Sequence, residues 1–191
     1  MRDGDDDALA ERAARGDRGA LEQLLERNAD RIHAVCRRLV AHPEDALDAT
    51  QEAMIAVARG IRRFDGRAAF TTWMYRVATN AALDELRRKR RRPTPADPQV
   101  PGRPEIAQAG SSVEDRVGTR LDVDAALATL PREFRVAVVL RDLCDLDYAE
   151  IAVVLDVPPG TVRSRIARGR AALTEQLGNP DTPRQRRTHD G

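Results

Sequence analysis

A cluster of prolines in the middle of the chain constrains its fold more than any other feature. Five of the eleven prolines fall within residues 93–104, and a run of small residues follows over 107–112. Because proline blocks helix and removes a backbone donor, this stretch predicts an extended linker. The predicted organisation is an N-terminal unit over 5–92, a flexible linker over 93–112, a C-terminal unit over 113–178 and a disordered tail over 179–191.

Apolar residues recur at helical spacing on both sides of this linker, and strand signals are nearly absent. A first helix is predicted from Leu21 to Leu39, behind a capping residue at Asp17. A second begins near Pro43 and carries Leu47, Met54, Val57, Ala58 and Ile61 on one side, and a third runs from about Thr71. Further helices are predicted near 114–129, 132–142, 148–155 and 160–176. The predicted fold class is all-α, with two small helical domains.

Charge is segregated along the chain, although the net charge is only +1. Residues 61–92 carry a net charge of +7 and residues 161–191 carry +4, whereas 1–60 and 93–160 are acidic, at −4 and −6. Two basic stretches, each beside acidic sequence, indicate two separate nucleic-acid contacts.

Several classes of protein are disfavoured by what the sequence lacks. No stretch approaches 18 consecutive apolar residues, and the acidic N-terminus has no apolar core, so we expect a cytoplasmic protein without membrane insertion. Cys36 and Cys144 form no CxxC motif, and His33 with Cys36 is too small a set for a metal site. No P-loop, GxGxxG or catalytic constellation occurs, so we expect no enzyme activity, no cofactor and no metal.

The most informative segment is YAEIAVVLDVPPGTVRSRIARGRAAL, at 148–173. A short helix, a turn at 157–160 and a second helix form a helix-turn-helix pattern. A buried stripe is predicted from Val162, Ile166, Gly169 and Leu173. Arg163, Ser164, Ala167 and Arg168 then point outward, as a helix in the major groove of DNA requires. The alternative is a solvated charged face on an ordinary helix.

A second segment, 64–92, combines aromatic and basic residues. It holds four of the chain's six aromatic residues, then Asn80, then six consecutive basic residues at 87–92. Aromatic rings beside a cationic stripe can hold an unstacked base and follow a phosphate backbone. The alternative is that the rings fill the core, and for Trp73 that reading is favoured. A third segment, 48–54, carries carboxylates and an amide on an outer helix face, and alone it indicates little.

In this order and spacing the segments resemble an extracytoplasmic-function sigma factor of bacterial RNA polymerase. The matching stretches are DATQEAMIAVARGI at 48–61, FDGRAAFTTWMYRVATNAALDELRRKRRR at 64–92, LPREFRVAVVLRDL at 130–143 and YAEIAVVLDVPPGTVRSRIARGRAAL at 148–173. The resemblance implies a sigma-2 domain and a sigma-4 domain joined by the linker. The implied partners are core RNA polymerase, through the clamp helices of its largest subunit and the flap of its second-largest subunit, promoter DNA and an anti-sigma factor.

The resemblance also implies roles for individual residues. Those implied to bind core polymerase are Asp48, Gln51, Glu52, Met54, Ile55 and Ile61. Those implied to open and read the −10 element are Phe64, Gly66, Arg67, Ala68, Ala69, Phe70, Asn80, Asp84, Arg87 and Arg88. The helix-turn-helix from Tyr148 to Ala167 would read the −35 element, with Thr161, Arg163, Ser164, Arg165, Ala167 and Arg168 as its contacts.

Two positions depart from the family pattern, so no relative's promoter sequence carries over to this chain. Ala167 stands where some relatives have a large aromatic residue, and Arg67 stands in a loop where an acidic residue is common. A polymerase-independent helix-turn-helix regulator is the second reading of the sequence. An anti-sigma or adaptor protein is the third, and the basic stretches disfavour it.

Overall fold

The computed structural model describes residues 3–91 and 123–177, and every regular element in these ranges is a helix. The N-terminal helices are α1 (Asp3–Ala14), α2 (Arg18–Leu39), α3 (Pro43–Gly60), the short 3-10 helix η1 (Ile61–Arg63) and α4 (Phe70–Arg91). A helix at 123–129, α6 (Arg132–Asp142), α7 (Tyr148–Leu155) and α8 (Pro159–Leu177) follow. The all-α prediction is confirmed, while the predicted linker and tail lie outside the described residues.

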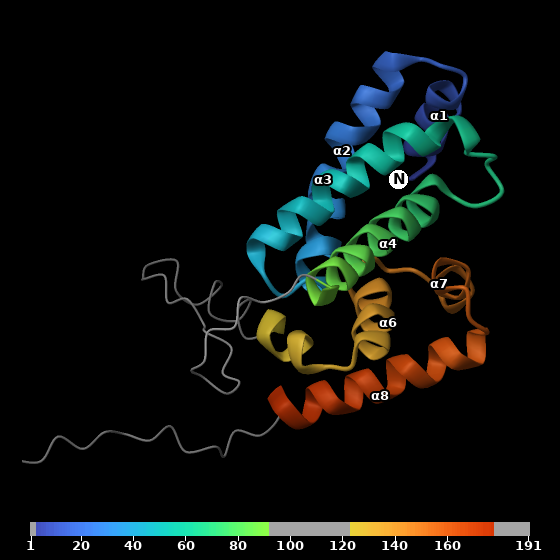
Figure 1. Ribbon diagram of the computed structural model, residues 1–191. Helices are drawn as coiled ribbons and strands as arrows, with labels where there is room; N and C mark the ends of the chain where they lie inside the picture. The colour runs from blue at the N-terminus through green and yellow to red at the C-terminus, as the bar shows by residue number, and fades with distance from the viewer. Residues whose placement is uncertain (1–2, 92–122, 178–191) are drawn as a thin grey trace, which may run out of the picture.

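Helices α2, α3 and α4 lie side by side and enclose the N-terminal core (Figure 1). Asp17 caps α2 as predicted, because its Oδ1 accepts the backbone N–H of Ala20 at 3.1 Å. Large side chains from all three helices are fully buried, among them Leu24, Val57 and Met74. This core fixes the start of α4, which carries the aromatic segment.

Helix α1 was not predicted from the sequence. Its five acidic residues mask the signal of a short apolar face, of which Leu9, Ala10 and Ala13 are buried. Asp6 is buried as well, and its Oδ2 accepts from Asn28 Nδ2 at 3.1 Å. Packing against α2, η1 and α4 therefore stabilises a helix whose own sequence signal is weak.

The C-terminal helices pack around α6. The apolar run Val136–Leu140, which could pass for a strand by composition, is buried over all five residues inside this helix. Helix α8 crosses α6 at Gly169, where an added Cβ would lie 2.6 Å from Val138 Cγ2. The glycine thus lets the predicted recognition helix rest closely on the core.

Helix α7 lies against α4, and α6 lies against α2 (Figure 1). Thr72 Oγ1 on α4 donates to Glu150 Oε1 on α7 at 2.7 Å, and Arg135 Nη1 on α6 donates to the Leu39 carbonyl at 3.1 Å. Arg37 also pairs with Asp124 at 3.1 Å. The N-terminal and C-terminal helices therefore form one packed body.

Both cysteines carry a protonated thiol at neutral pH. Burial raises the pKa of Cys36 to about 11 and that of Cys144 to about 12. Neighbouring His33 contacts Thr50, with 3.2 Å between its Nδ1 and the hydroxyl oxygen. A neutral thiol is a poor nucleophile, so neither cysteine is set up for rapid oxidation.

Across 3–91 and 123–177 no helix is both long and apolar enough to span a membrane.

Candidate nucleic-acid interface

The segment 64–70, which comprises the loop between η1 and α4 and the first residue of α4, is anchored at both ends. At its start the Phe64 N–H donates to the Ile61 carbonyl at 3.0 Å, and the Phe64 ring packs edge-on against Trp73 at a centroid distance of 5.8 Å. At its end Phe70 is only 1 % exposed and its N–H donates to Asp7 Oδ1 at 2.7 Å. Both ends of the loop are therefore held by contacts with the helical core.

The tip of this loop is exposed and polar. Gly66 has φ +69, a backbone conformation that glycine adopts without strain. The Arg67 N–H donates to Asp65 Oδ1 at 3.2 Å, which tightens the turn. The Arg67 guanidinium also lies 3.3 Å from the same carboxylate, but at 89 % side-chain exposure this ion pair is weak and can be exchanged for another anion.

A cavity of about 390 Å³ lies between this loop, α4 and α7. Its lining residues are Phe64, Asp65, Arg67 and Ala68 of the loop, Thr72, Trp73 and Arg76 of α4, and Val153 of α7. Aromatic and aliphatic walls with two arginines suit a planar, anionic ligand. Arg76 was missed by the sequence reading, although its spacing of three from Trp73 puts both on one face of a helix.

Four sequence-predicted residues need correction or comment. Phe70 and Ile61 are 1 % and 2 % exposed, so in this structure neither side chain can contact a partner. Asn80 is exposed on α4 but does not line the cavity, since ten residues of helix place it about 15 Å beyond Phe70. Trp73 is partly buried, so its side chain both packs against the core and lines the cavity.

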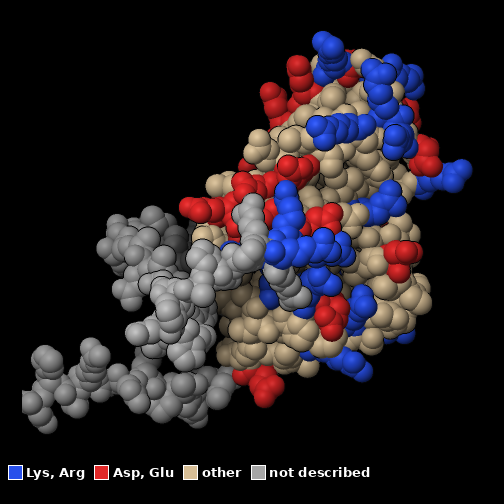
Figure 2. All heavy atoms as spheres, viewed as in Figure 1, with Lys and Arg blue, Asp and Glu red and all other residues tan. Residues whose placement is uncertain are grey.

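The basic end of α4 is covered by ion pairs. Asp84 pairs with Arg87 at 2.6 Å, Glu85 pairs with Arg88, and Asp45 of α3 pairs with Lys89 at 2.5 Å. Figure 2 shows a group of Lys and Arg side chains at the centre of the face, where α4 ends in Figure 1, with acidic side chains beside it. The Asp84–Arg87 pair is exposed on both sides and therefore weak, so a phosphate can replace that carboxylate. The Glu85 and Asp45 side chains are only 4 % and 18 % exposed, so their pairs with Arg88 and Lys89 are less readily exchanged.

Helix α8 presents the predicted outward face. Arg163, Ser164, Ala167 and Arg168 are exposed, Thr161 and Arg165 are half-buried, and Val162, Ile166 and Gly169 are buried. The Arg163 guanidinium lies over the Tyr148 ring, 5.9 Å from its centroid. The predicted outward face is therefore exposed, and three of the four residues of the predicted stripe are buried, whereas Leu173 is half-buried. Farther along, Arg170 is held by Asp142, with Nε 3.2 Å from Oδ2.

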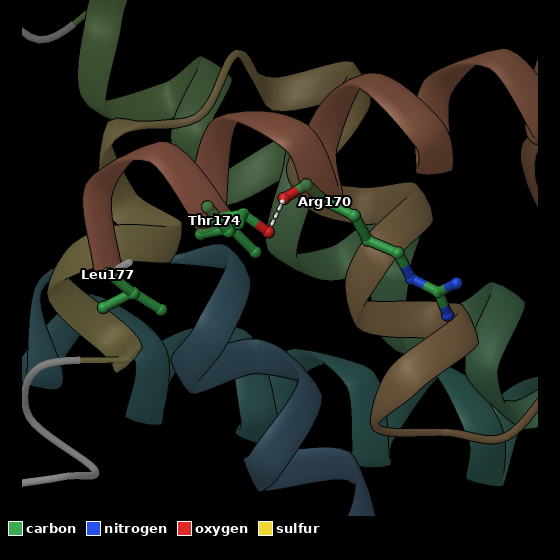
Figure 3. A pocket seen from close by; sticks show the side chains of 4 residues that line it. Arg170, Thr174 and Leu177 are labelled. Carbon is green, nitrogen blue, oxygen red and sulfur yellow. Dashed lines mark hydrogen bonds between the residues drawn. The ribbon is translucent and has the colours of Figure 1, made fainter. Parts of the chain in front are cut away.

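A second, open cavity of about 460 Å³ lies at the C-terminal end of α8. Figure 3 shows Arg170, Thr174 and Leu177 along one side of this helix, with the Thr174 hydroxyl donating to the Arg170 carbonyl at 3.0 Å. Leu173 completes the lining, and Leu177 is 52 % exposed. The C-terminal end of α8 therefore presents an apolar surface, whereas the N-terminal part of the same helix carries the exposed arginines.

Helix α3 carries a mixed surface. Asp48, Gln51 and Glu52 are exposed, while Met54 and Ile55 are half-buried. Leu47, which the pattern places on the same side of the helix as the buried Val57, is 60 % exposed. Leu47 lies one turn before Gln51 on the helix, and the small Ala46, Ala49 and Ala53 fill the buried face instead.

Comparisons with known proteins agree with this geometry. Residues 24–92 match the family model of sigma-70 region 2, and residues 120–173 match that of sigma-70 region 4. The chain is 40 % identical over 168 residues to the ECF RNA polymerase sigma factor SigM of Mycobacterium tuberculosis, covering 87 % of this chain and 82 % of the relative. It is 34 % identical over 180 residues to the ECF RNA polymerase sigma-E factor of Escherichia coli K12, covering 90 % and 94 %.

Solved structures show the same fold. CnrH in complex with the cytosolic domain of CnrY is similar at a TM-score of 0.68 and 24 % identity, covering 92 % of this chain and 98 % of that one. The sigma factor RpoE of Bartonella quintana, in complex with the anti-sigma factor NepR, is similar at a TM-score of 0.67 and 23 % identity, covering 82 % and 96 %.

Proposed function

This chain belongs to the extracytoplasmic-function sigma factors of bacterial RNA polymerase. From that membership we propose which of its surfaces act at each step of transcription initiation at specific promoters. The observation that carries the proposal is the pair of basic surfaces with different chemistry. One is a loop cavity with aromatic walls, suited to opened DNA, and the other is an exposed helix face, suited to duplex DNA. We assign them to units over 5–92 and 113–178.

The loop cavity is the proposed site for an unstacked base of the −10 element. Phe64 and Trp73 offer ring faces for stacking, and Arg67 and Arg76 offer charge for the adjoining phosphates. Gly66, Ala68 and Ala69 shape the loop. Asn80, Asp84, Arg87 and Arg88 extend the contact along α4, where the arginines would follow the backbone of the separated strand.

The exposed face of α8 is the proposed reader of the −35 element. Its residues in this role are Thr161, Arg163, Ser164, Arg165, Ala167 and Arg168. An arginine fork matches the O6 and N7 atoms of guanine, whereas a phosphate contact carries no sequence information. Small Ser164 and Ala167 let the helix approach the floor of the major groove.

Three protein contacts are proposed, two of them on named surfaces. The exposed residues Asp48, Gln51 and Glu52 of α3 would dock on the clamp helices of the largest polymerase subunit, with Leu47 at the edge of that contact. The apolar end of α8 at Leu177 would meet the flap of the second-largest subunit. Both similar solved structures are complexes, and RpoE is bound to an anti-sigma factor, so we propose an anti-sigma factor for this chain too.

Contact between α7 and α4 makes the free chain a poor DNA binder in this proposal. Val153 of α7 lines the same cavity that would receive the base, and the Thr72–Glu150 hydrogen bond holds α7 there. In this proposal a DNA strand reaches the loop more readily once α7 has moved away from α4. Binding to polymerase, through surfaces on both α3 and α8, would supply the free energy for that separation.

We expect the double variant Asp48→Arg with Glu52→Arg to assemble with core polymerase about tenfold more weakly, because it reverses two exposed charges on the proposed docking face. Co-purification with core polymerase measures the effect, and circular dichroism should show unchanged helix content. Glu22→Arg with Glu26→Arg, which reverses two exposed charges four residues apart on α2, is the matched control and should assemble normally. Unchanged assembly by the double variant would remove α3 from the interface.

A further inference from the structure

The start of α4 is held by a residue far away in the sequence. Asp7 of α1 accepts the backbone N–H of Phe70 through its Oδ1 at 2.7 Å, across a separation of 63 residues. We propose that Asp7 is a positioning residue for the promoter-reading loop 64–70. This inference rests on the proposed function of that loop in reading the −10 element.

The local sequence cannot supply this contact. The first backbone N–H groups of a helix have no partner within the helix, and a side chain at the preceding position commonly accepts from them. Here the preceding residues are Ala68 and Ala69, and alanine has no acceptor. The Ala69 carbonyl already accepts from the Trp73 N–H at 3.1 Å, which makes Ala69 the capping position of α4. Asp7 therefore supplies, from another helix, an acceptor for the first N–H of α4, for which the local sequence offers none.

A carboxylate is well suited to this position. The N-terminus of a helix carries a partial positive charge, and a nearby anion is stabilised there. A hydrogen bond to a charged acceptor is also stronger than one between neutral groups. Asp7 is half-buried, so water competes less for its oxygen than at an exposed cap.

Helix α1 holds both ends of the loop. It packs against η1, which precedes the loop, and against α4, which follows it. Leu9 and Ala10 of α1 are buried in the shared core, so the helix that carries Asp7 is itself fixed. Between the two anchors the tip residues Asp65, Gly66, Arg67 and Ala68 are exposed.

The consequence is a loop whose ends are fixed before DNA arrives. Ordering a flexible loop on binding costs free energy, and a loop that is already ordered avoids much of this cost. Loss of the Asp7 acceptor would free the Phe70 end and let the Arg67 tip take other positions. The effect should appear at strand opening and in preference for −10 bases, where loop geometry matters.

The test compares holoenzymes carrying Asp7→Ala, Asp7→Asn and Asp5→Ala. Asp5 is an exposed acid on the same helix, and its variant makes the same change of charge. Each holoenzyme transcribes a duplex promoter, the same promoter pre-melted at −10, and a library of −10 sequences. The thermal unfolding temperature of each variant is measured first, and transcription is assayed below it.

We expect Asp7→Ala to lower duplex transcription about tenfold, the effect of one lost cap, with a much smaller change on the pre-melted template and a flatter −10 preference. Asp7→Asn should stay within about threefold of wild type, because its amide oxygen still accepts an N–H. Asp5→Ala should match wild type. If Asp7→Ala does not fold, Asp7→Glu displaces the acceptor by one methylene, and the same difference between templates is expected.

The inference is overturned if Asp7→Ala transcribes like wild type, or if it loses activity equally on both templates with an unchanged −10 preference. Arg67→Ala, at the loop tip, separates this failure from failure of the proposed function. If Arg67→Ala shifts the −10 preference and Asp7→Ala does not, the positioning role of Asp7 is rejected and the reading role of the loop is retained. If neither variant shifts it, the loop is not a reader and both proposals fall.

Discussion

Replacement of Asn80 by alanine should depress transcription from duplex promoters about tenfold or more, while transcription from templates pre-melted at −10 stays near wild type. Asn80 is exposed on α4, and its amide can both donate to and accept from a base edge. Unstacking a base costs a few kcal/mol, which contacts on the protein must offset. A pre-melted template no longer requires that step, so the two templates separate opening from binding.

Gln23→Ala is the matched control for this prediction. Gln23 is also an exposed amide on a helix, but it lies on α2, outside the proposed interface. Both templates should be transcribed normally by this variant. Equal losses on the two templates with Asn80→Ala would instead mean that Asn80 supports the structure of α4 and has no part in opening.

The second large effect is expected on the recognition helix. Truncation of at least one of Arg163 and Arg168 to alanine should cost roughly 1–3 kcal/mol at a preferred promoter and relax preference at one −35 position. Both side chains are exposed on α8, and the Arg163 guanidinium makes a cation–π contact with the Tyr148 ring. A library of −35 sequences transcribed by each variant measures the change.

Arg165→Ala provides the comparison within the same helix. Arg165 is half-buried at the flank of the exposed face, so its loss should weaken all promoters alike and lower the salt slope of binding by about one unit. If the Arg163 and Arg168 variants also lose activity uniformly across −35 sequences, these arginines position the helix on DNA and do not read bases.

Features governed by local sequence were predictable. The cap at Asp17, the start of α3 at Pro43 and the buried stripe of α8 all follow from residues within a few turns of one another. Such patterns depend on helix periodicity and on the few side chains that cap a helix, which a single sequence displays directly.

Features governed by distant contacts were not predictable. Asp7 meets Phe70 across 63 residues, and Thr72 meets Glu150 across 78. Nothing in the acidic run of α1 distinguishes the carboxylate that caps another helix from those that face water. The exposure of Leu47 and the burial of Phe70 likewise depend on which neighbours cover each face. The pattern placed Leu47 on the same side of the helix as the buried Val57, and it left open whether the aromatic rings fill the core.

Reconstituted transcription is the most direct test of the account. Purified protein is mixed with core polymerase and a genomic library of promoter fragments, and the 5′ ends of transcripts are mapped, while binding of the free protein to the same DNA is measured at physiological salt. The account predicts transcripts that begin at a distinct set of promoters only when the protein is added, together with weak DNA binding by the free chain. Nanomolar, sequence-selective binding by the free protein without promoter-specific transcripts would contradict it and indicate a polymerase-independent regulator.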